Sequence, residues 1–177
     1  MFTEHTMESA PAAARRSMTA AASHNGYLPT AIALMATSPE LLDGFLKMSG
    51  AFDGTTLDPL ARETLVMTMA ARNACHLCVA MHTGRLTKLG ADPTLIAELR
   101  AGSPVSDERL EAIRVFTLRV LDTAGDVGEP ALKAFLAHGY TERNALEVVL
   151  GIGAYTMSTL ANRLTGAPLD EPMRQFA

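Results

Sequence analysis

The sequence predicts an all-α fold, a compact bundle of about seven or eight helices joined by short connections. Alanine, leucine and methionine dominate the apolar residues, which make up 48% of the chain, and these types favour helix over strand. No segment alternates between apolar and polar residues as a half-buried strand would. Three Ser-Pro or Asp-Pro pairs, which begin at residues 38, 58 and 92, also stand directly before a run with helical spacing.

These pairs are start signals for helices in the first half of the chain. Ser38, Asp58 and Asp92 are each followed by proline, which suits a helix whose cap residue accepts an amide hydrogen bond and whose first position lacks one. A shorter apolar run precedes the first pair, and Cys75 opens or continues another helix. The pattern predicts helices over residues 28–36, 39–50, 59–73, 75–89 and 93–100.

The second half of the chain carries three further helical segments. Ser106 is expected to cap a helix over 106–124, a shorter helix covers 130–137, and Thr141 caps a last one that extends to about residue 164. The middle of this last helix is apolar nearly all round and contains Gly151 and Gly153. Each glycine costs roughly 1 kcal/mol relative to alanine. The helix is therefore expected to be buried, with another backbone close against it.

Composition and charge limit the classes of function. Residues 1–26 are interpreted as an arm, partly disordered or docking on a neighbouring subunit, and residues 27–177 as the helical domain. The net charge of −4 indicates no nucleic acid partner. No apolar run reaches the ~18 residues of a membrane helix, so no membrane partner is expected. Two cysteines three positions apart are too few for a secreted disulfide framework, which favours a cytoplasmic protein.

The residues with chemical potential gather between positions 63 and 89. This stretch contains both cysteines of the chain and three other candidate site residues, which together are Glu63, Cys75, His76, Cys78 and His82. At about 100° per residue, Cys75, Cys78 and His82 fall within an arc of about 60° on one helix. His76 points about 100° away from Cys75 and is less well placed. We therefore expect a reactive stripe formed by the two cysteines and His82.

The stripe is suited to thiol redox chemistry. The thiolate form of cysteine is favoured near a helix start, beside histidine and in C-x-x-C pairs. A thiolate that attacks a peroxide becomes a sulfenic acid, which condenses with a neighbouring thiol to a disulfide, and an external dithiol then reduces this disulfide. Glu63 can relay a proton to the cysteine–histidine unit if its helix packs antiparallel against the next one.

The spacing of Glu63, Cys75, Cys78 and His82 resembles the signature of AhpD-like alkylhydroperoxidases in the carboxymuconolactone decarboxylase superfamily, and in particular its C-x-x-C peroxidase-related branch. The similarity extends over about residues 28–165, where the part after the signature is generic helical sequence. The resemblance implies an all-α fold, a homo-oligomer (trimer or hexamer), a hydroperoxide substrate and a dithiol reductant, for which a lipoyl-bearing protein is one candidate. We expect no cofactor and no metal.

By this resemblance, Glu63, Cys75, Cys78 and His82 are the proton-relay and redox residues, with His76 as an accessory. Cys78 is assigned as the attacking thiolate because His82 lies one turn away, and Cys75 as the resolving thiol, expected to be the more exposed sulfur. The closing Asn162-Arg163 pair either caps the last helix or lines the site, and the structural role is favoured.

Other interpretations of the same residues stay open. The cysteines can be two buried small side chains, or zinc ligands together with His82 and Glu63, although three ligands on one helical stripe are awkward for a tetrahedron. A non-enzymatic helical oligomer that senses redox state or binds a metal is the alternative from a different class. A carboxymuconolactone-type decarboxylase is a minor one, because that branch generally lacks the paired cysteines.

Overall fold

The computed structural model describes residues 2–177, and this part of the chain is entirely helical, without strands. The predicted all-α fold is therefore confirmed. The helices follow one another in the order α1 (Ala12–Asn25), α2 (Thr30–Met35), α3 (Pro39–Asp53), α4 (Pro59–Arg72), α5 (His76–Lys88), α6 (Pro93–Ala101), α7 (Glu108–Asp122), α8 (Gly128–Ala137), α9 (Glu142–Thr165) and a 3-10 helix, η1 (Glu171–Phe176).

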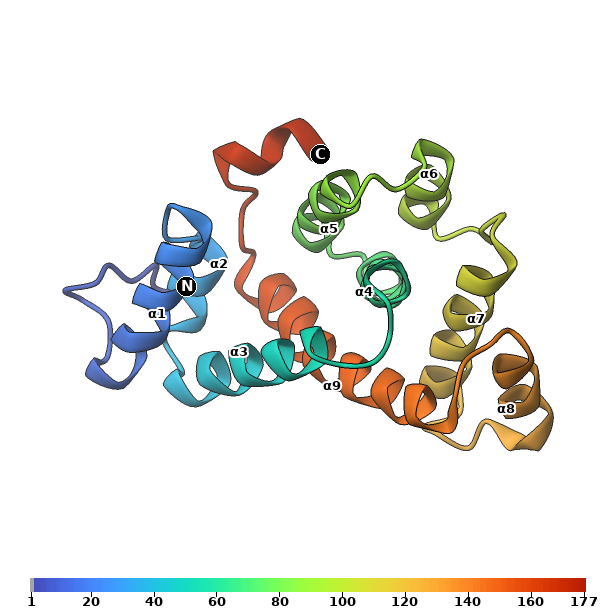
Figure 1. Cartoon of the computed structure of the whole chain (residues 1–177). Coiled ribbons are helices and arrows are strands. Elements are labelled where there is room, and N and C mark those ends of the chain that lie inside the picture. Colours follow the sequence, from blue (N-terminus) through green and yellow to red (C-terminus); the bar gives the residue numbers. More distant parts are fainter. Residues whose placement is uncertain (1) are drawn as a thin grey trace.

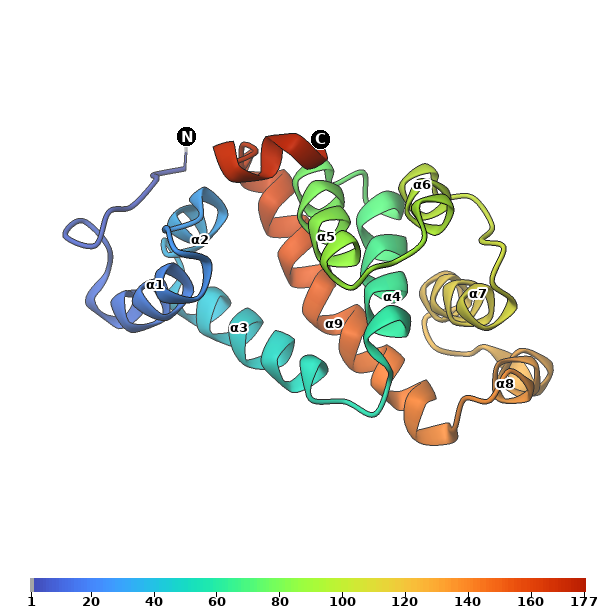
Figure 2. The same ribbon diagram turned by 45° about the horizontal axis from the view of Figure 1, so that its top comes forward.

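Helix α4 is the central element of the bundle. Figure 1 looks almost along its axis and shows α5, α6, α7 and α9 around it, and the tertiary contacts agree with this view. The turned view in Figure 2 shows the long α9 running behind α4 and α5, with α3 beside it. Helices α1 and α2 lie at one end and α7 and α8 at the other. Residues on α4 therefore face several other helices at once, and any polar side chain there must find partners among them.

The start signals of the sequence act as the cap residues of the helices. Ser38, Asp58, Asp92 and Thr141 each accept a hydrogen bond from a backbone amide of the following turn, as predicted. The predicted cap at Ser106 is wrong by one residue. Asp107 caps α7 instead, and Ser106 donates its hydroxyl to Glu98 of α6. A carboxylate at this position also complements the positive end of the helix dipole, which makes Asp107 the stronger cap.

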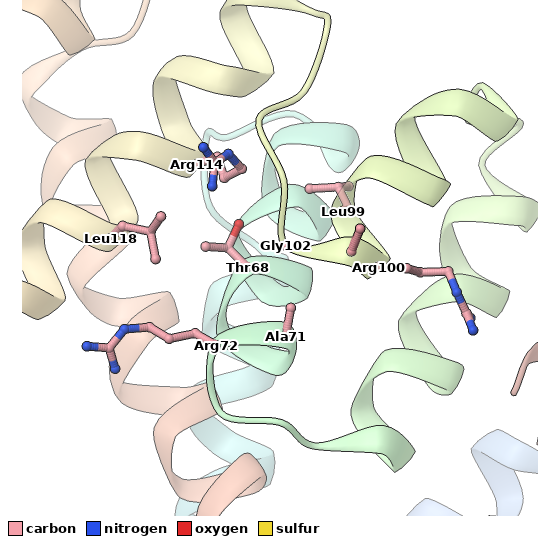
Figure 3. A pocket seen from close by; sticks show the side chains of 9 residues that line it. Thr68, Ala71, Arg72, Leu99, Arg100, Gly102, Arg114 and Leu118 are labelled. Carbon is pink, nitrogen blue, oxygen red and sulfur yellow. The ribbon is translucent and has the colours of Figure 1, made fainter.

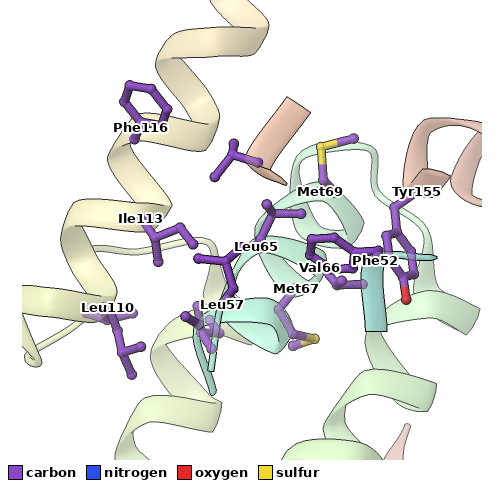
Figure 4. Close-up of a cluster of buried hydrophobic side chains, with 14 of the residues drawn as sticks. Phe52, Leu57, Leu65, Val66, Met67, Met69, Leu110, Ile113, Phe116 and Tyr155 are labelled. Carbon is purple, nitrogen blue, oxygen red and sulfur yellow. The ribbon is translucent and has the colours of Figure 1, made fainter. Parts of the chain in front are cut away.

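The main hydrophobic core surrounds α4. It combines buried side chains from α3, α4, α7, α9 and the loop between α3 and α4, of which Figure 4 labels Phe52, Leu57, Leu65, Val66, Met67, Met69, Leu110, Ile113, Phe116 and Tyr155. The aromatic rings of Phe116, Phe135 and Tyr140 continue this core between α7 and α8 as two stacked pairs. Burial of a large apolar side chain contributes about 1.5–3 kcal/mol. Such a core is large enough to hold α4 rigidly in place.

The two glycines in α9 allow a close approach, as expected, but the neighbour is a side chain. A Cβ atom added at Gly151 would stand 2.6 Å from the ring of Phe52, and one at Gly153 would stand 3.1 Å from the methyl of Met48. Both neighbours come from α3. Helix α3 packs closely against α9, as expected, and an aromatic ring of α3 fills the space that the missing side chain at Gly151 leaves.

The segment assigned to an N-terminal arm contains α1, a helix that was not predicted from the sequence. Ala14, Met18 and Ala21 of α1 are buried in a second apolar cluster, together with residues of α2 and α3 such as Met35 and Leu42. These contacts lie within one chain. Docking of residues 1–26 on a neighbouring subunit stays a prediction.

The C-terminal residues fold back over α5. The ring of Phe176 fills the space beside Gly84, where an added Cβ would stand 2.9 Å away, and the Phe176 carbonyl accepts a hydrogen bond from Arg100 at 2.7 Å. Asp170 accepts hydrogen bonds from the hydroxyl of Thr30 at 2.7 Å and from its backbone amide at 3.3 Å. This segment therefore closes the end of the bundle at which α5 begins (Figure 2). Among the described residues, no helix has the length and apolar character needed to cross a bilayer.

Candidate active site on helices α4, α5 and α9

The turn between α4 and α5 places Cys75 at the start of α5. Ala74 has a φ of 49°, a left-handed conformation that costs a non-glycine residue about 1–2 kcal/mol. Two contacts from α9 hold this turn: Asn73 donates to the hydroxyl of Thr159 at 2.8 Å, and Arg163 donates to the carbonyl of Asn73. The last helix therefore stabilises the turn that fixes where the first cysteine stands.

Cys75 and Cys78 are joined by a disulfide. Cys75 is the cap residue of α5, and its sulfur accepts a hydrogen bond from the amide of Cys78 at 3.4 Å. Their residues are only 2% and 3% exposed. The expectation that Cys75 would be the more exposed sulfur is therefore wrong. The apolar cover over both sulfurs comes from α2, α4, α5 and the C-terminal segment and includes Ala31, Ala70, Leu77, Ala167 and Leu169.

Glu63 and His82 form a buried pair beside the cysteines. Oxygen Oε2 of Glu63 lies 2.6 Å from Nδ1 of His82, and the two residues are 7% and 4% exposed. Because Glu63 lies in the first half of α4 and His82 in the middle of α5, the contact requires α5 to turn back along α4, which is the antiparallel packing that the sequence left open. His82 also stands one turn after Cys78 on α5, as the angular arrangement predicted. The structure thus pairs Glu63 with His82, and His82 stands on the same helix as Cys78, one turn away.

The charge of Glu63 is stabilised by its neighbours. Burial raises the pKa of Glu63, but the interaction with His82, supported by Arg85, outweighs it and sets the pKa below the ordinary value of a carboxyl group. Nitrogen Nη1 of Arg85 lies 3.6 Å from Oε1, the oxygen that His82 does not bind. The ring of Tyr155 packs edge-on against the imidazole at 5.4 Å between centroids, and burial raises the pKa of its phenol. Glu63 is therefore ionised at neutral pH and can receive or return a proton of His82.

His76, by contrast, lies outside this arrangement. It is the first residue of α5 and is exposed to solvent. This position agrees with the angular count, which turned His76 away from the stripe. A role for His76 as an accessory stays a prediction.

Asn162 of α9 belongs to the site, contrary to the structural role that we favoured for it. Its Nδ2 donates to Sγ of Cys78 at 3.4 Å, and the residue is 5% exposed. Its Oδ1 is buried and has no hydrogen-bond partner among the described residues. An unsatisfied buried acceptor typically costs about 1–3 kcal/mol. Tyr155, Thr159 and Asn162 are spaced so that they lie along one face of α9. This spacing is the signal in the sequence that could have indicated that α9, besides α4 and α5, lines the site.

Two cavities open near α4, and neither includes a cysteine. One, of about 260 Å³, borders the Glu63–Arg85 pair and is lined by Asp53, Pro59, Arg62, Glu63, Arg85, Lys88 and Leu89. The other, of about 340 Å³, lies between α4, α6 and α7 (Figure 3). Figure 3 shows the side chains of Arg72 and Arg100 extending away from it on opposite sides, and Arg72 is paired with Asp122 at 2.9 Å. The first cavity therefore reaches Glu63 of the buried pair, whereas the second is lined by none of the predicted site residues.

A metal site has no geometric support in this state of the protein. In the part of the chain that the structure describes, no three His, Cys, Asp or Glu side chains converge as a bound metal ion would require. The two thiols that the zinc interpretation needs are bonded to each other.

Comparison with known proteins identifies the class. Residues 39–105 match the Carboxymuconolactone decarboxylase family, and this segment contains Glu63, both cysteines and both histidines of the signature. Among curated protein sequences, none is significantly similar to this chain. The match thus covers the segment that carries the signature, which is similar to this family, and the fold of the chain is AhpD-like. The resemblance seen in the sequence is thereby confirmed.

Solved structures with the same fold cover nearly the whole chain. A peroxidase-related protein with an alkylhydroperoxidase AhpD core from Ralstonia eutropha JMP134 is 19% identical, with a TM-score of 0.85 over 97% of this chain and 93% of that one. A peroxidase-related protein from Silicibacter sp. TM1040 is also 19% identical, with a TM-score of 0.78 over 94% and 90%. The debrominase Bmp8, solved as a cysteine-to-alanine variant with 2,3,4-tribromopyrrole, is 14% identical, with a TM-score of 0.79 over 99% and 95%. At these identities the likeness establishes the fold, which can host more than one reaction.

Proposed function

We propose that this protein is a thiol-dependent peroxidase that reduces hydroperoxides through a Cys75–Cys78 dithiol/disulfide cycle. The observation that carries the proposal is the buried Glu63–His82 pair, with a separation of 2.6 Å, one helical turn from Cys78. Structural cysteines do not need such a pair, whereas a peroxidase needs a thiolate and a proton donor at the same place.

The oxidative half of the cycle uses Cys78 first. Its thiolate attacks the terminal oxygen of ROOH, an S–O bond forms and the O–O bond breaks, and the departing alkoxide takes a proton from His82 to leave as ROH. Cys78 is now a sulfenic acid. The thiolate of Cys75 attacks its sulfur, the S–S bond forms, and the hydroxide released takes a proton to become water. Glu63 balances the charge of His82 while the imidazole carries the extra proton.

The reductive half needs an external dithiol. One thiolate of the reductant attacks the disulfide and its second thiol resolves the mixed disulfide, which returns both cysteines to thiols and leaves the reductant oxidised. A dithiol on a long flexible arm, such as a lipoyl group on a protein, suits a disulfide that is buried this deeply. The cycle belongs in a reducing compartment, so we place the protein in the cytoplasm.

We also propose a homo-oligomer, a trimer or hexamer, with segment 1–26 docking on a neighbouring subunit. Helix α9 supports an interface, because it exposes four large apolar side chains, Leu146, Val149, Leu160 and Leu164. At about 100° per residue these fall within an arc of about 60°, on the side of α9 opposite to Tyr155 and Asn162. One face of α9 therefore builds the site while the other is free for another subunit.

The direct test is hydroperoxide consumption by the full-length protein with dihydrolipoamide as reductant. We expect turnover by the wild type and none by Cys78→Ser. Peroxide-treated Cys75→Ser protein should hold a sulfenic acid at Cys78, which a sulfenic-acid-specific reagent and peptide mass spectrometry would locate. Trapping only at Cys75 in Cys78→Ser protein would reverse the two roles.

Debromination is a second candidate, favoured by the likeness to Bmp8 over almost the whole chain. Because Bmp8 was solved with 2,3,4-tribromopyrrole as a cysteine-to-alanine variant, this compound belongs in the assay beside the hydroperoxides. Release of bromide without peroxide turnover would favour this candidate. A disulfide that forms and is reduced without catalytic turnover of either substrate would favour the redox-sensing oligomer. Activity on a carboxymuconolactone alone would favour the decarboxylase.

A further inference from the structure

We infer that Asn162 is a catalytic residue of the Cys78 reaction, whose amide nitrogen stabilises the Cys78 thiolate and whose amide oxygen receives the O–H group of the hydroperoxide. The inference rests on the proposed function, and it assigns to Asn162 a role that neither the sequence motif nor the family match contains. Three observations carry it: the contact to sulfur, the unpartnered oxygen and the burial of both.

The contact to sulfur fixes which way the amide faces. A disulfide or thiolate sulfur has no hydrogen, so it can only accept, and the group placed 3.4 Å from Sγ of Cys78 is the Nδ2 donor. A hydrogen bond to the charged form of a group favours that form. The contact therefore becomes stronger when the disulfide is reduced and Cys78 ionises, because the sulfur then carries a full negative charge.

The amide oxygen of the same side chain is left as an acceptor beside the reacting atom. Oδ1 of Asn162 has no partner among the described residues although it is fully buried. It is bonded to the same carbon as Nδ2 and therefore lies next to the sulfur contact. Neither the disulfide nor the thiolate can donate to it. The terminal O–H of a hydroperoxide aligned for attack on Cys78 is a hydrogen-bond donor, and it can supply the hydrogen bond that Oδ1 of Asn162 lacks.

The same O–H stays with its oxygen through the first step. When the S–O bond forms and the O–O bond breaks, the hydroxyl moves from the peroxide to the sulfur and becomes the sulfenic acid O–H. Oδ1 can hold it before and after transfer, while His82 protonates the alkoxide on the other side. Asn162 thus accepts a hydrogen bond from the oxygen that is transferred to sulfur, and His82 donates a proton to the oxygen that leaves as the alcohol.

Other charged groups of the site do not replace this function. Glu63, His82 and Arg85 interact with one another through the contacts described above. The aromatic neighbour on α9, Tyr155, packs against the imidazole ring. On α9 itself, Arg163 binds the carbonyl of Asn73. Among the described residues, none of these charged groups forms a hydrogen bond with the Asn162 side chain, so a change at position 162 removes no ion pair.

The test uses the reduced Cys75→Ser protein, in which Cys78 is the only thiol, with and without Asn162→Leu. Alkylation by iodoacetamide across a pH series reports the thiolate fraction of Cys78. Formation of the sulfenic acid with tert-butyl hydroperoxide, measured at a pH where the thiol is fully ionised, reports the reaction with an O–H donor. Ser158→Ala, a buried position one turn earlier on α9, serves as the matched control and should change neither rate.

Two results are expected of Asn162→Leu. The thiolate fraction at neutral pH falls about tenfold, because the hydrogen bond to the charged sulfur is lost. The peroxide rate of the fully ionised thiol falls about tenfold further, whereas the iodoacetamide rate does not, because iodoacetamide has no O–H group to place. Asn162→Asp keeps the shape of the side chain and carries the test if the leucine variant does not fold; its carboxylate should lower the thiolate fraction further.

The inference and the proposed function can fail separately. An unchanged alkylation profile, or equal losses with peroxide and iodoacetamide, would overturn the inference while wild-type turnover leaves the peroxidase standing. A Cys75→Ser protein that reacts with iodoacetamide and with no hydroperoxide, while the wild type turns over, would overturn the inference and the assignment of Cys78 as the attacking thiolate. Absence of hydroperoxide turnover in the wild type would end the peroxidase proposal, and the acceptor role of Asn162 with it.

Discussion

Two buried glutamates, Glu63 on α4 and Glu147 on α9, look alike when they are considered one at a time. They are 7% and 8% exposed, and their hydrogen bonds hold the pKa of each below the ordinary carboxyl value against the opposing effect of burial. Their partners differ. Glu63 binds His82 and Arg85, whereas Glu147 binds the backbone amide and hydroxyl of Thr56 at 3.0 and 2.8 Å.

The partners decide what each carboxylate can do. Glu147 also accepts from Asn144 at 2.9 Å and from Arg143 at 3.0 Å, and Asn144 forms the capping box of α9 with Thr141. None of these groups exchanges a proton near neutral pH. An imidazole group does exchange a proton in this pH range, so the Glu63–His82 pair can transfer a proton. The Glu147 cluster can only hold the loop between α3 and α4 onto α9. Burial and a lowered pKa are therefore common to an acid–base site and a structural clamp.

The largest expected effect separates the two carboxylates by activity. Glu63→Gln should lower hydroperoxide turnover by about 10²- to 10⁴-fold, because an amide cannot balance the charge of a protonated His82. The change in unfolding free energy should be about 1 kcal/mol or less, since glutamine has nearly the same shape. Steady-state peroxide consumption and urea unfolding measure the two quantities. Glu147→Gln is the matched control and should keep wild-type turnover; full activity in Glu63→Gln would remove the proton relay from the proposed mechanism.

The next largest effect is on stability, and here the change at Glu147 alters the protein while turnover stays the same. Glu147→Ala leaves the backbone amide and the hydroxyl of Thr56 without their acceptor, and we expect a loss of about 1–3 kcal/mol in unfolding free energy. The Asn144 side chain keeps a second acceptor, the Thr56 hydroxyl, at 2.9 Å. Turnover of the folded protein should not change, because the clamp lies at the other end of α9 from the cysteines. Urea unfolding followed by circular dichroism measures the loss. A variant with wild-type stability and reduced turnover would show that the clamp takes part in the reaction.

The same comparison shows what the sequence could predict. The helices between residues 30 and 165 follow from caps, prolines and apolar spacing, which act within a few residues. The stripe of Cys75, Cys78 and His82 is likewise local to one helix, and its link to Glu63 follows from the family spacing.

Contacts between segments far apart in the sequence could not be predicted from these local patterns. Asn162 meets Cys78 across 84 positions, and Glu147 meets Thr56 across 91. Only the packing of α9 against α3, α4 and α5 creates these contacts, so a polar residue in an apolar helix could not be assigned to a site or to a clamp. Helix α1 was missed for a related reason: its alanines carry a weak pattern, and burial against α3 supplies the stability that the pattern lacks.

A moderate effect should appear in the pH dependence of stability. Because the pKa of Glu147 is lowered on folding, its contribution is fully present above the ordinary carboxyl value of 4.5 and is lost as the pH falls through the lower folded value. The same sign holds for Glu63. Glu147→Gln should therefore lose less unfolding free energy on acidification than the wild type. Urea unfolding at a series of acidic pH values tests this, and equal slopes for both proteins would mean that folding does not lower the pKa of Glu147.

The smallest effect concerns the arginines that flank the two carboxylates. The side chain of Arg143 is 70% exposed and its contact with Glu147 spans one helical turn, so Arg143→Ala should cost less than about 1 kcal/mol. Arg85 is less exposed, at 41%, and lies on the acid–base pair, so Arg85→Ala should change turnover more than stability. Measuring both variants at low and high salt sharpens the contrast, because screening weakens the exposed pair first. Equal effects of the two arginines on turnover would show that long-range charge, and not contact with the Glu63–His82 pair, is what Arg85 contributes.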